Sequence, residues 1–152
     1  MDAITQLLAI EAIRQVKARY FYGLDHKDWE LWRREVWTPD ARLEVPEAGV
    51  VVTPLETLIG WVSAATADQV SVHHGHMPDI TFTSETSADV IWAMEDRLYR
   101  SPGHPLADGA TWLHGFGHYH ETYVRLARGW RLHTSRLTRL RVESGRVAGL
   151  PG

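Results

Sequence analysis

Four long stretches of β-forming residues dominate the second half of the chain and restrict the fold more than any other feature. Their side chains alternate in polarity or are rich in branched and aromatic types. Turn signals such as Ser84-Glu85 and Arg128-Gly129 separate neighbours, and the segment 100–110, with two prolines and two glycines, predicts one long loop. We therefore expect four long antiparallel strands. They cover residues 70–83, 88–99, 115–126 and 130–142.

Shorter elements are predicted ahead of these strands. Apolar residues recur at helical spacing over 3–24, and a second helix is expected over 28–37, with Asp28 as its N-cap. Two short strands are expected over 41–45 and 49–52. A third helix should follow them.

The third helix has its own start signal at Thr53. Thr53 suits the N-cap, Pro54 the first helical position, and Glu56 the third position of a capping box. We expect this helix to end near Thr66.

Three helices followed by long antiparallel strands specify the α+β class. We expect the helices to pack on one face of a strongly curved, mostly antiparallel sheet, which forms a cone-shaped barrel with one open end. The open end of such a cone is a natural pocket. The length of 152 residues predicts a single domain over 1–152.

Composition argues against several classes of function. The net charge of −3 offers no basic excess for nucleic acid, and the lack of cysteine removes disulfides and thiolate metal sites. No apolar run is long enough for a membrane span, and the start at Asp2 has no basic targeting segment, so we expect a cytoplasmic protein. Seven tryptophans indicate either a large aromatic core or a pocket with bulky apolar walls.

The run 71–76 places three histidines in a predicted strand. Imidazole titrates near neutrality, so it suits proton transfer and metal binding, although a buried histidine with its hydrogen bonds satisfied is the simpler interpretation. Strand alternation separates His73 from His74 and His76. The run alone does not say which of them matters.

Three further side chains are candidates for a site. Asp96 shares the inward face of its predicted strand with apolar residues, and a buried carboxylate needs a partner or a raised pKa. Asp25 follows the end of the first helix, where it is either a turn residue or a site residue. Tyr20 lies on the apolar stripe of the first helix, and its hydroxyl needs a partner once buried.

The last strand offers two arginines. Alternation from Trp130 and Leu132 predicts Arg136 inside and Arg139 outside, and a β-bulge would reverse that assignment.

Two other motifs carry weak signals. His118 and His120 share a strand face, a spacing compatible with a metal site that includes His73 or His74, but without a supporting motif we expect no metal. The segment 115–117 (Gly-Phe-Gly) is too short for a phosphate loop.

Three motifs together resemble a known family. Tyr20-Phe-Tyr-Gly-Leu-Asp25, the segment His-His-Gly-His-Met-Pro-Asp-Ile that begins at His73, and Trp92-Ala-Met-Glu-Asp96 resemble the bile acid 7α-dehydratases. These belong to the nuclear transport factor 2-like (polyketide cyclase-like) superfamily, with scytalone dehydratase and the hexachlorocyclohexane dehydrochlorinases. The resemblance spans about residues 10–142. It departs in the loop 100–110 and in a shorter segment after the last strand.

The resemblance implies the site and the activity. It favours Arg139 over Arg136, and of the three clustered histidines it selects His73, so that His74 and His76 are expected to pack or to support the site from behind. The implied activity is that of a cofactor-independent dehydratase, a carbon–oxygen lyase. The implied site residues are Tyr20, Asp25, His73, Asp96 and Arg139.

In this hypothesis His73 is the base, oriented by Asp25, and Tyr20 donates to the substrate oxygen. Arg139 binds or polarises an acidic group or carbonyl, and Asp96 orients the substrate or assists proton transfer. The expected substrate is an apolar, steroid-like or polycyclic hydroxy-carbonyl compound, and the expected assembly is a homodimer or homotrimer. A double-bond isomerase and a non-catalytic module for ligand binding or dimerisation remain alternatives.

Overall fold

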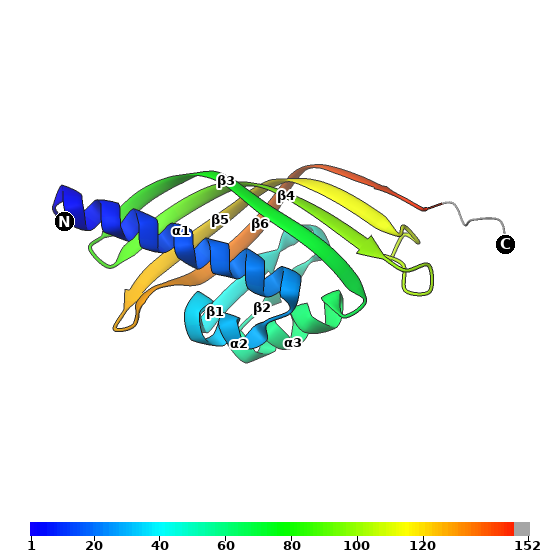
Figure 1. Ribbon diagram of the computed structural model, residues 1–152, viewed down its shortest axis with the longest axis horizontal. Helices are drawn as coiled ribbons and strands as arrows, with labels where there is room; N and C mark the ends of the chain where they lie inside the picture. The colour runs from blue at the N-terminus through cyan, green and yellow to red at the C-terminus, as the bar shows by residue number, and fades with distance from the viewer. Residues whose placement is uncertain (148–152) are drawn as a thin grey trace.

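The computed structural model describes residues 1–147, in which helices and short helical turns accompany one six-stranded sheet (Figure 1). The helical elements are α1 (Ala3–His26), α2 (Trp29–Leu31) with the π-helical turn η1 (Trp32–Val36), the short 3-10 turn η2 (Pro46–Ala48) and α3 (Leu55–Thr66). The strands are β1 (Trp37–Val45), β2 (Val50–Val52), β3 (Gln69–Ser84), β4 (Ser87–Arg100), β5 (Trp112–Leu126) and β6 (Gly129–Gly145).

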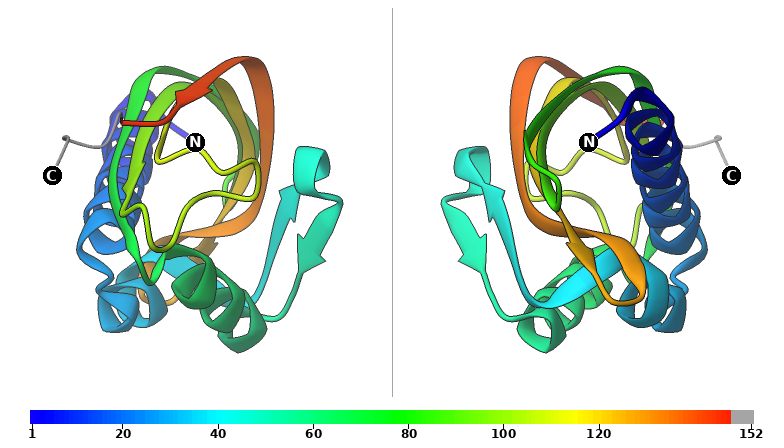
Figure 2. Two further views of the ribbon diagram at one scale, coloured as in Figure 1. Left: turned by 90° about the vertical axis from the view of Figure 1, so that its right-hand side faces the viewer. Right: turned by 90° about the vertical axis from the view of Figure 1, so that its left-hand side faces the viewer.

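The strand order is β2-β1-β6-β5-β4-β3. Among the described pairs only β1 and β6 are parallel, so the sheet is mostly antiparallel as predicted. The long strands curve strongly, with α1 along one side and the β1–β2 hairpin standing apart on the other (Figure 2). Strands β2 and β3 remain as edges, so the cone is open rather than a closed barrel. The predicted α+β class is confirmed.

Local signals explain helix α1. The Asp2 side chain accepts a hydrogen bond from the backbone N–H of Thr5 at 2.8 Å, and Lys27 ends the helix in the left-handed conformation. Ile13 and Val16 are fully buried against the sheet.

No helix within residues 1–147 has the length and apolar character needed to cross a membrane.

The second helix is shorter than predicted. Asp28 caps it as expected, accepting from the backbone N–H of Leu31 at 2.9 Å, but the chain then forms a π-helical turn and enters β1 at Trp37. Strand β1 therefore begins at Trp37, four residues before the predicted start at Ala41. The extended backbone at Trp37 lets its side chain pack in the core, where only 2% of it is exposed.

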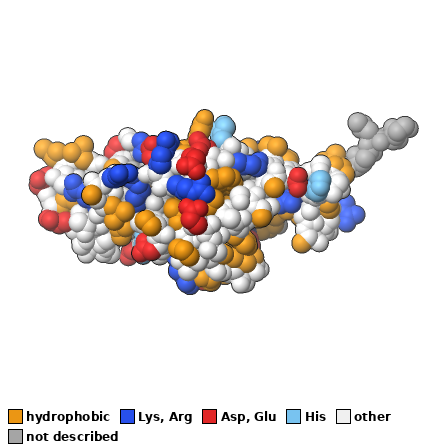
Figure 3. Space-filling model, turned by 90° about the horizontal axis from the view of Figure 1, so that it is seen from below, with side chains coloured by type: hydrophobic (Ala, Val, Ile, Leu, Met, Phe, Trp, Pro, Cys, Tyr) orange, Lys and Arg blue, Asp and Glu red, His pale blue; other side chains and the backbone are white. Residues whose placement is uncertain are grey.

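The predicted capping box at Thr53 is wrong. Helix α3 starts one residue later, with Pro54 at the N-cap and no capping hydrogen bond from a side chain. The Glu56 carboxylate instead accepts two hydrogen bonds from Arg33, at 2.9 and 3.0 Å, and so ties η1 to α3. When the molecule is seen from below the view of Figure 1, charged side chains of both signs lie side by side on its surface (Figure 3).

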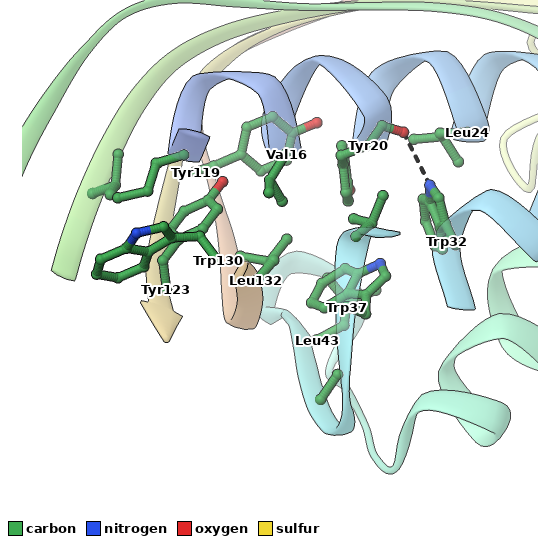
Figure 4. Packing of buried hydrophobic residues seen from close by; sticks show 14 of the residues in the cluster. Val16, Tyr20, Leu24, Trp32, Trp37, Leu43, Tyr119, Tyr123, Trp130 and Leu132 are labelled. Carbon is green, nitrogen blue, oxygen red and sulfur yellow. Dashed lines mark hydrogen bonds between the residues drawn. The ribbon is translucent and has the colours of Figure 1, made fainter. Parts of the chain in front are cut away.

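Aromatic packing joins the helices to the sheet and positions Tyr20. The Tyr20 and Trp32 rings stack with centroids 5.1 Å apart, and the Trp32 indole N–H donates to the Tyr20 carbonyl at 3.0 Å (Figure 4). Trp37 packs edge-on against both rings. Several tryptophans therefore form a core, which is one of the two roles that composition left open.

Candidate active site

A cavity of about 240 Å³ lies between α3 and the concave face of the sheet. Four of the five predicted site residues line it, although they come from α1, β3, β4 and β6. They are Tyr20, His73, Asp96 and Arg139. The fifth, Asp25, contacts His73 from behind.

The carboxylate of Asp25 holds His73 in place. Its Oδ1 lies 2.6 Å from Nδ1 of His73, and its Oδ2 accepts from the His73 backbone N–H at 3.0 Å. The Ser71 hydroxyl donates to Oδ1 at 2.8 Å. Although burial acts to raise the pKa of Asp25, the hydrogen bonds from His73 and Ser71 outweigh it and hold this pKa below its ordinary value. Asp25 is therefore an ionised partner of the imidazole and not a simple turn residue.

Asp96 and Arg139 form a buried ion pair beside His73, because Asp96 lies opposite His73 in the register of β3 with β4. Arg139 donates through Nη1 and Nη2 to the two carboxylate oxygens of Asp96, at 2.8 and 2.7 Å, and through Nε to Glu47 at 2.7 Å. Only 3% of Asp96 is exposed. Although burial acts to lower the pKa of Arg139, the two carboxylates raise it above its ordinary value. Three of the five guanidinium N–H groups are thus occupied within the protein.

Gly115 makes room for this pair. It lies opposite Asp96 in the β4–β5 register. A Cβ atom at Gly115 would lie 2.8 Å from Cζ of Arg139, and closer still to Nη1 of Arg139 and Oδ1 of Asp96. The Gly-Phe-Gly segment therefore owes its first glycine to the space that the guanidinium needs.

A β-bulge decides which arginine faces the cavity. Thr122 pairs with Thr134 and Tyr123 with Leu132, so His133 is an extra residue in β6. The bulge reverses the alternation after Leu132, which places Arg139 inside. The prediction from simple alternation, with Arg136 inside, is wrong, since the Arg136 side chain is 53% exposed and lies near Glu44 on the outer face.

Several lining residues were missed from the sequence, among them the polar side chains of Tyr119, Glu47, Gln69 and Arg100. Tyr119 lies with its ring centroid 6.0 Å from that of Tyr20. Burial raises the pKa of both phenols, so both hydroxyls stay protonated and able to donate. Alternation along β5 offered a signal for Tyr119, because it shares a face with the buried Tyr123. The exposed Glu47 in η2 offered none.

The remaining wall is largely apolar. Trp61 and Val62 of α3, Trp32 of η1 and Leu137 of β6 contribute side chains to it. The tryptophans therefore supply both a core and a pocket wall. The combination of an apolar wall with a histidine, two carboxylates and a few polar donors suits proton transfer on a bound organic molecule.

The other histidines lie away from the cavity. His74 and His76 are exposed on the outer face, where His74 contacts Glu95 at 3.1 Å, so the expectation that they support the site from behind is wrong. His118 and His120 also alternate away from the concave face, and His120 contacts Thr138 at 3.1 Å. Within residues 1–147 no three metal-binding side chains cluster.

Comparisons with solved structures show the same fold in proteins of low sequence identity. A protein from Kribbella flavida, Kfla4162, has a TM-score of 0.82 at 22% identity, covering 91% of this chain and 95% of its own. A candidate scytalone dehydratase from Novosphingobium aromaticivorans has a TM-score of 0.80 at 21% identity, covering 97% and 94%. The hexachlorocyclohexane dehydrochlorinase LinA-type3 from Novosphingobium barchaimii has a TM-score of 0.81 at 15% identity, covering 99% and 100%.

The sequence itself also matches a family. The profile of the SnoaL-like domain matches residues 5–136. This match confirms the resemblance to the nuclear transport factor 2-like superfamily that the three motifs indicated.

Proposed function

Because this chain belongs to the family of SnoaL-like domains, we propose that it is a cofactor-independent lyase that removes water from a small hydroxy-carbonyl compound. Dehydratases and dehydrochlorinases are among the proteins of similar fold. The observation that carries the proposal is the histidine on the cavity wall, His73, paired at 2.6 Å with the ionised Asp25.

The pairing gives His73 a defined role. With Nδ1 donating to the Asp25 carboxylate, the free lone pair belongs to Nε2, and the imidazole lines the cavity as a base. The positive charge that His73 gains on taking a proton is stabilised by Asp25. The ordered hydrogen bond from Ser71 keeps that carboxylate in position.

The proposed elimination proceeds in two steps. His73 takes the proton from the carbon next to the substrate carbonyl, and the C–H electron pair forms an enolate whose oxygen accepts hydrogen bonds from Tyr20 and Tyr119. The enolate then re-forms the carbonyl while the C–O bond at the neighbouring carbon breaks. The imidazolium returns its proton to the departing oxygen, so water leaves and His73 is restored.

The contacts of Arg139 favour a neutral oxygen as the substrate group that this arginine meets. Arg100 also lines the cavity, where it donates to the Gln69 side chain and to the Ala65 carbonyl. Asp96 and Glu47 already satisfy most of Arg139, so we assign the guanidinium to shaping the pocket and polarising a neutral oxygen rather than to binding a carboxylate. Asp96, held by two hydrogen bonds from Arg139, serves to fix that arginine.

The size of the cavity favours a compact substrate. A volume of about 240 Å³ is below the roughly 300–1,000 Å³ of common ligand sites, which points to a substrate with one or two rings rather than four.

We further propose that the chain acts as a single domain in a cytoplasmic homo-oligomer.

The test uses a panel of cyclic hydroxy-ketones with one to four rings. Loss of water is followed by mass spectrometry and by the absorbance of the conjugated product. We expect turnover of small members, and a fall of roughly 10²-fold or more for His73→Ala and Asp25→Ala. His74→Ala, on the same strand but exposed, is the matched control and should turn over as the unmodified protein does.

One outcome would reject the proposed base, and two would reject the dehydratase. Unchanged turnover in His73→Ala or Asp25→Ala would remove the histidine–aspartate pair from the reaction. A product of unchanged mass with a moved double bond would identify an isomerase. Binding of the panel without any product would identify a ligand-binding module.

A further inference from the structure

A second buried ion pair lies behind the cavity and does not line it. Lys17 Nζ lies 2.5 Å from Oε1 of Glu121, with 1% of Lys17 and 3% of Glu121 exposed. The Ser135 hydroxyl donates to the same oxygen at 3.0 Å, and the Tyr123 hydroxyl donates to Oε2 at 2.7 Å. Strands β5 and β6 thereby fix the carboxylate, and the carboxylate fixes the ammonium.

The fold itself does not require this pair. Desolvating two charges costs more free energy than their attraction commonly returns, and well-packed apolar residues of similar volume are often at least as stabilising. The neighbours of Lys17 on the inner face of α1, Ile13 and Val16, are apolar. A charged pair at this place therefore calls for a role other than stability.

The aromatic contacts of Lys17 indicate that role. Its ammonium lies 3.7 Å from the ring centroid of Tyr119, 4.1 Å from that of Tyr20 and 4.8 Å from that of Phe21, all within the range of cation–π attraction. Tyr20 and Tyr119 are the two phenols that line the cavity. The ammonium thus contacts both rings at once, although Lys17 itself does not line the cavity.

We propose that Lys17, anchored by Glu121, is a positioning residue that sets the two tyrosine hydroxyls of the cavity at a fixed spacing. The hydroxyls can then meet one developing oxyanion together, without reorganisation at the moment of reaction. This inference rests on the proposed function in taking the two phenols as substrate donors.

The ammonium is sensitive to alkaline pH. Burial lowers the pKa of Lys17 to about 8, although the Glu121 charge opposes this. The titratable groups that face it are Glu121, Tyr119 and Tyr123 on β5 and Tyr20 on α1. Burial raises the pKa of the three phenols, so Lys17 loses its proton before they do.

The first measurement does not depend on activity. Tyrosine labelled with ¹³C at the ring Cζ is followed by NMR through the alkaline range, with signals assigned by Tyr→Phe variants. We expect the Tyr20 and Tyr119 signals to shift together near pH 8, where Lys17 loses its proton, while the signals of the exposed Tyr22 and Tyr99 do not shift with them. Signals of Tyr20 and Tyr119 that shift independently of each other, or that shift unchanged in the Lys17→Met, Glu121→Gln variant, would overturn the inference.

The second measurement uses a variant that keeps the buried charge balanced. Lys17→Met with Glu121→Gln leaves no unpaired charge and keeps hydrogen-bonding atoms for Tyr123 and Ser135. The probe is para-nitrophenol, whose absorbance reports the bound phenolate, a mimic of an enolate. We expect the folded double variant to bind the phenolate roughly tenfold more weakly, because the hydroxyl pair is no longer fixed.

The outcomes separate the two proposals. Equal phenolate affinity in the unmodified protein and the double variant would reject the role of Lys17 and leave the proposed lyase standing. Failure of the unmodified protein to bind para-nitrophenol would argue against the cavity as an oxyanion site. The NMR shifts would still test the contact of Lys17 with the two tyrosine rings.

Discussion

Replacing Gly115 by alanine is the sharpest single test of the arrangement around Arg139. A methyl group at this position would occupy space held by the guanidinium and by Oδ1 of Asp96. Either Arg139 leaves its partner or the two strands move apart. In the first case Asp96, 3% exposed, remains as a buried carboxylate without a counter-charge.

The expected magnitude follows from two opposing effects. Breaking a buried ion pair costs about 3–5 kcal/mol, whereas replacing glycine by alanine within a strand returns about 0.5–1 kcal/mol by restricting the unfolded chain. We therefore expect Gly115→Ala to lower the free energy of unfolding by about 2–4.5 kcal/mol. For a chain of this length that lowers the melting temperature by roughly 4–18 °C.

Urea unfolding followed by tryptophan fluorescence measures the loss. Gly60→Ala is the matched control, because a Cβ atom on Gly60 of α3 has nothing within 4 Å, and this change should stabilise the protein by up to about 1 kcal/mol. Gly115→Ala should cost much less in a background that lacks the pair, Asp96→Asn with Arg139→Met. An unfolding midpoint for Gly115→Ala equal to or above that of the unmodified protein would refute the reasoning.

Three further predictions address other parts of the site and the fold. Tyr20→Phe removes only a hydroxyl and should lower kcat by roughly 10²-fold with little change in melting temperature, and an unchanged kcat would remove Tyr20 from the reaction. The pKa of Asp25 is lower in the folded protein than its unfolded value of about 3.8, so its contribution to stability is complete above that value and is lost as the pH falls through the folded pKa. Asp25→Asn should therefore reduce the fall in stability between neutral pH and about pH 3, measured by urea titration, and a fall as steep as before would contradict this. Glu56→Gln breaks an exposed pair with Arg33 and should cost under about 1 kcal/mol in the same assay, with a larger loss counting against a surface role.

The sequence predicts the sheet better than the starts of the helices. Alternation over 14 residues of β4 is a repeated signal, and it correctly places Asp96 inside. The start of α3 depends on one cap, and there the attraction of Glu56 to Arg33 outweighs a capping box at Thr53. Long periodic patterns average over such competition, whereas single-residue signals do not.

In the candidate site, too, some features could be predicted from the sequence and others could not. The family resemblance selects Arg139, and the structure brings it to the cavity, but residue-by-residue alternation favours Arg136 because a bulge at His133 depends on the pairing of β6 with β5. The buried pair of Lys17 with Glu121 could not be predicted from the sequence either, since it joins residues 104 positions apart. Contacts that depend on how strands align cannot be deduced from local spacing.

The extra residue at His133 makes this point of β6 tolerant of a deletion. Paired residues of antiparallel strands share a face of the sheet, and without His133 the strand would still pair Leu132 with Tyr123 and Thr134 with Thr122, now by plain alternation. Arg139 would therefore still face the cavity. Related chains can gain or lose a residue at this one point without changing which side chains of the last strand line the pocket.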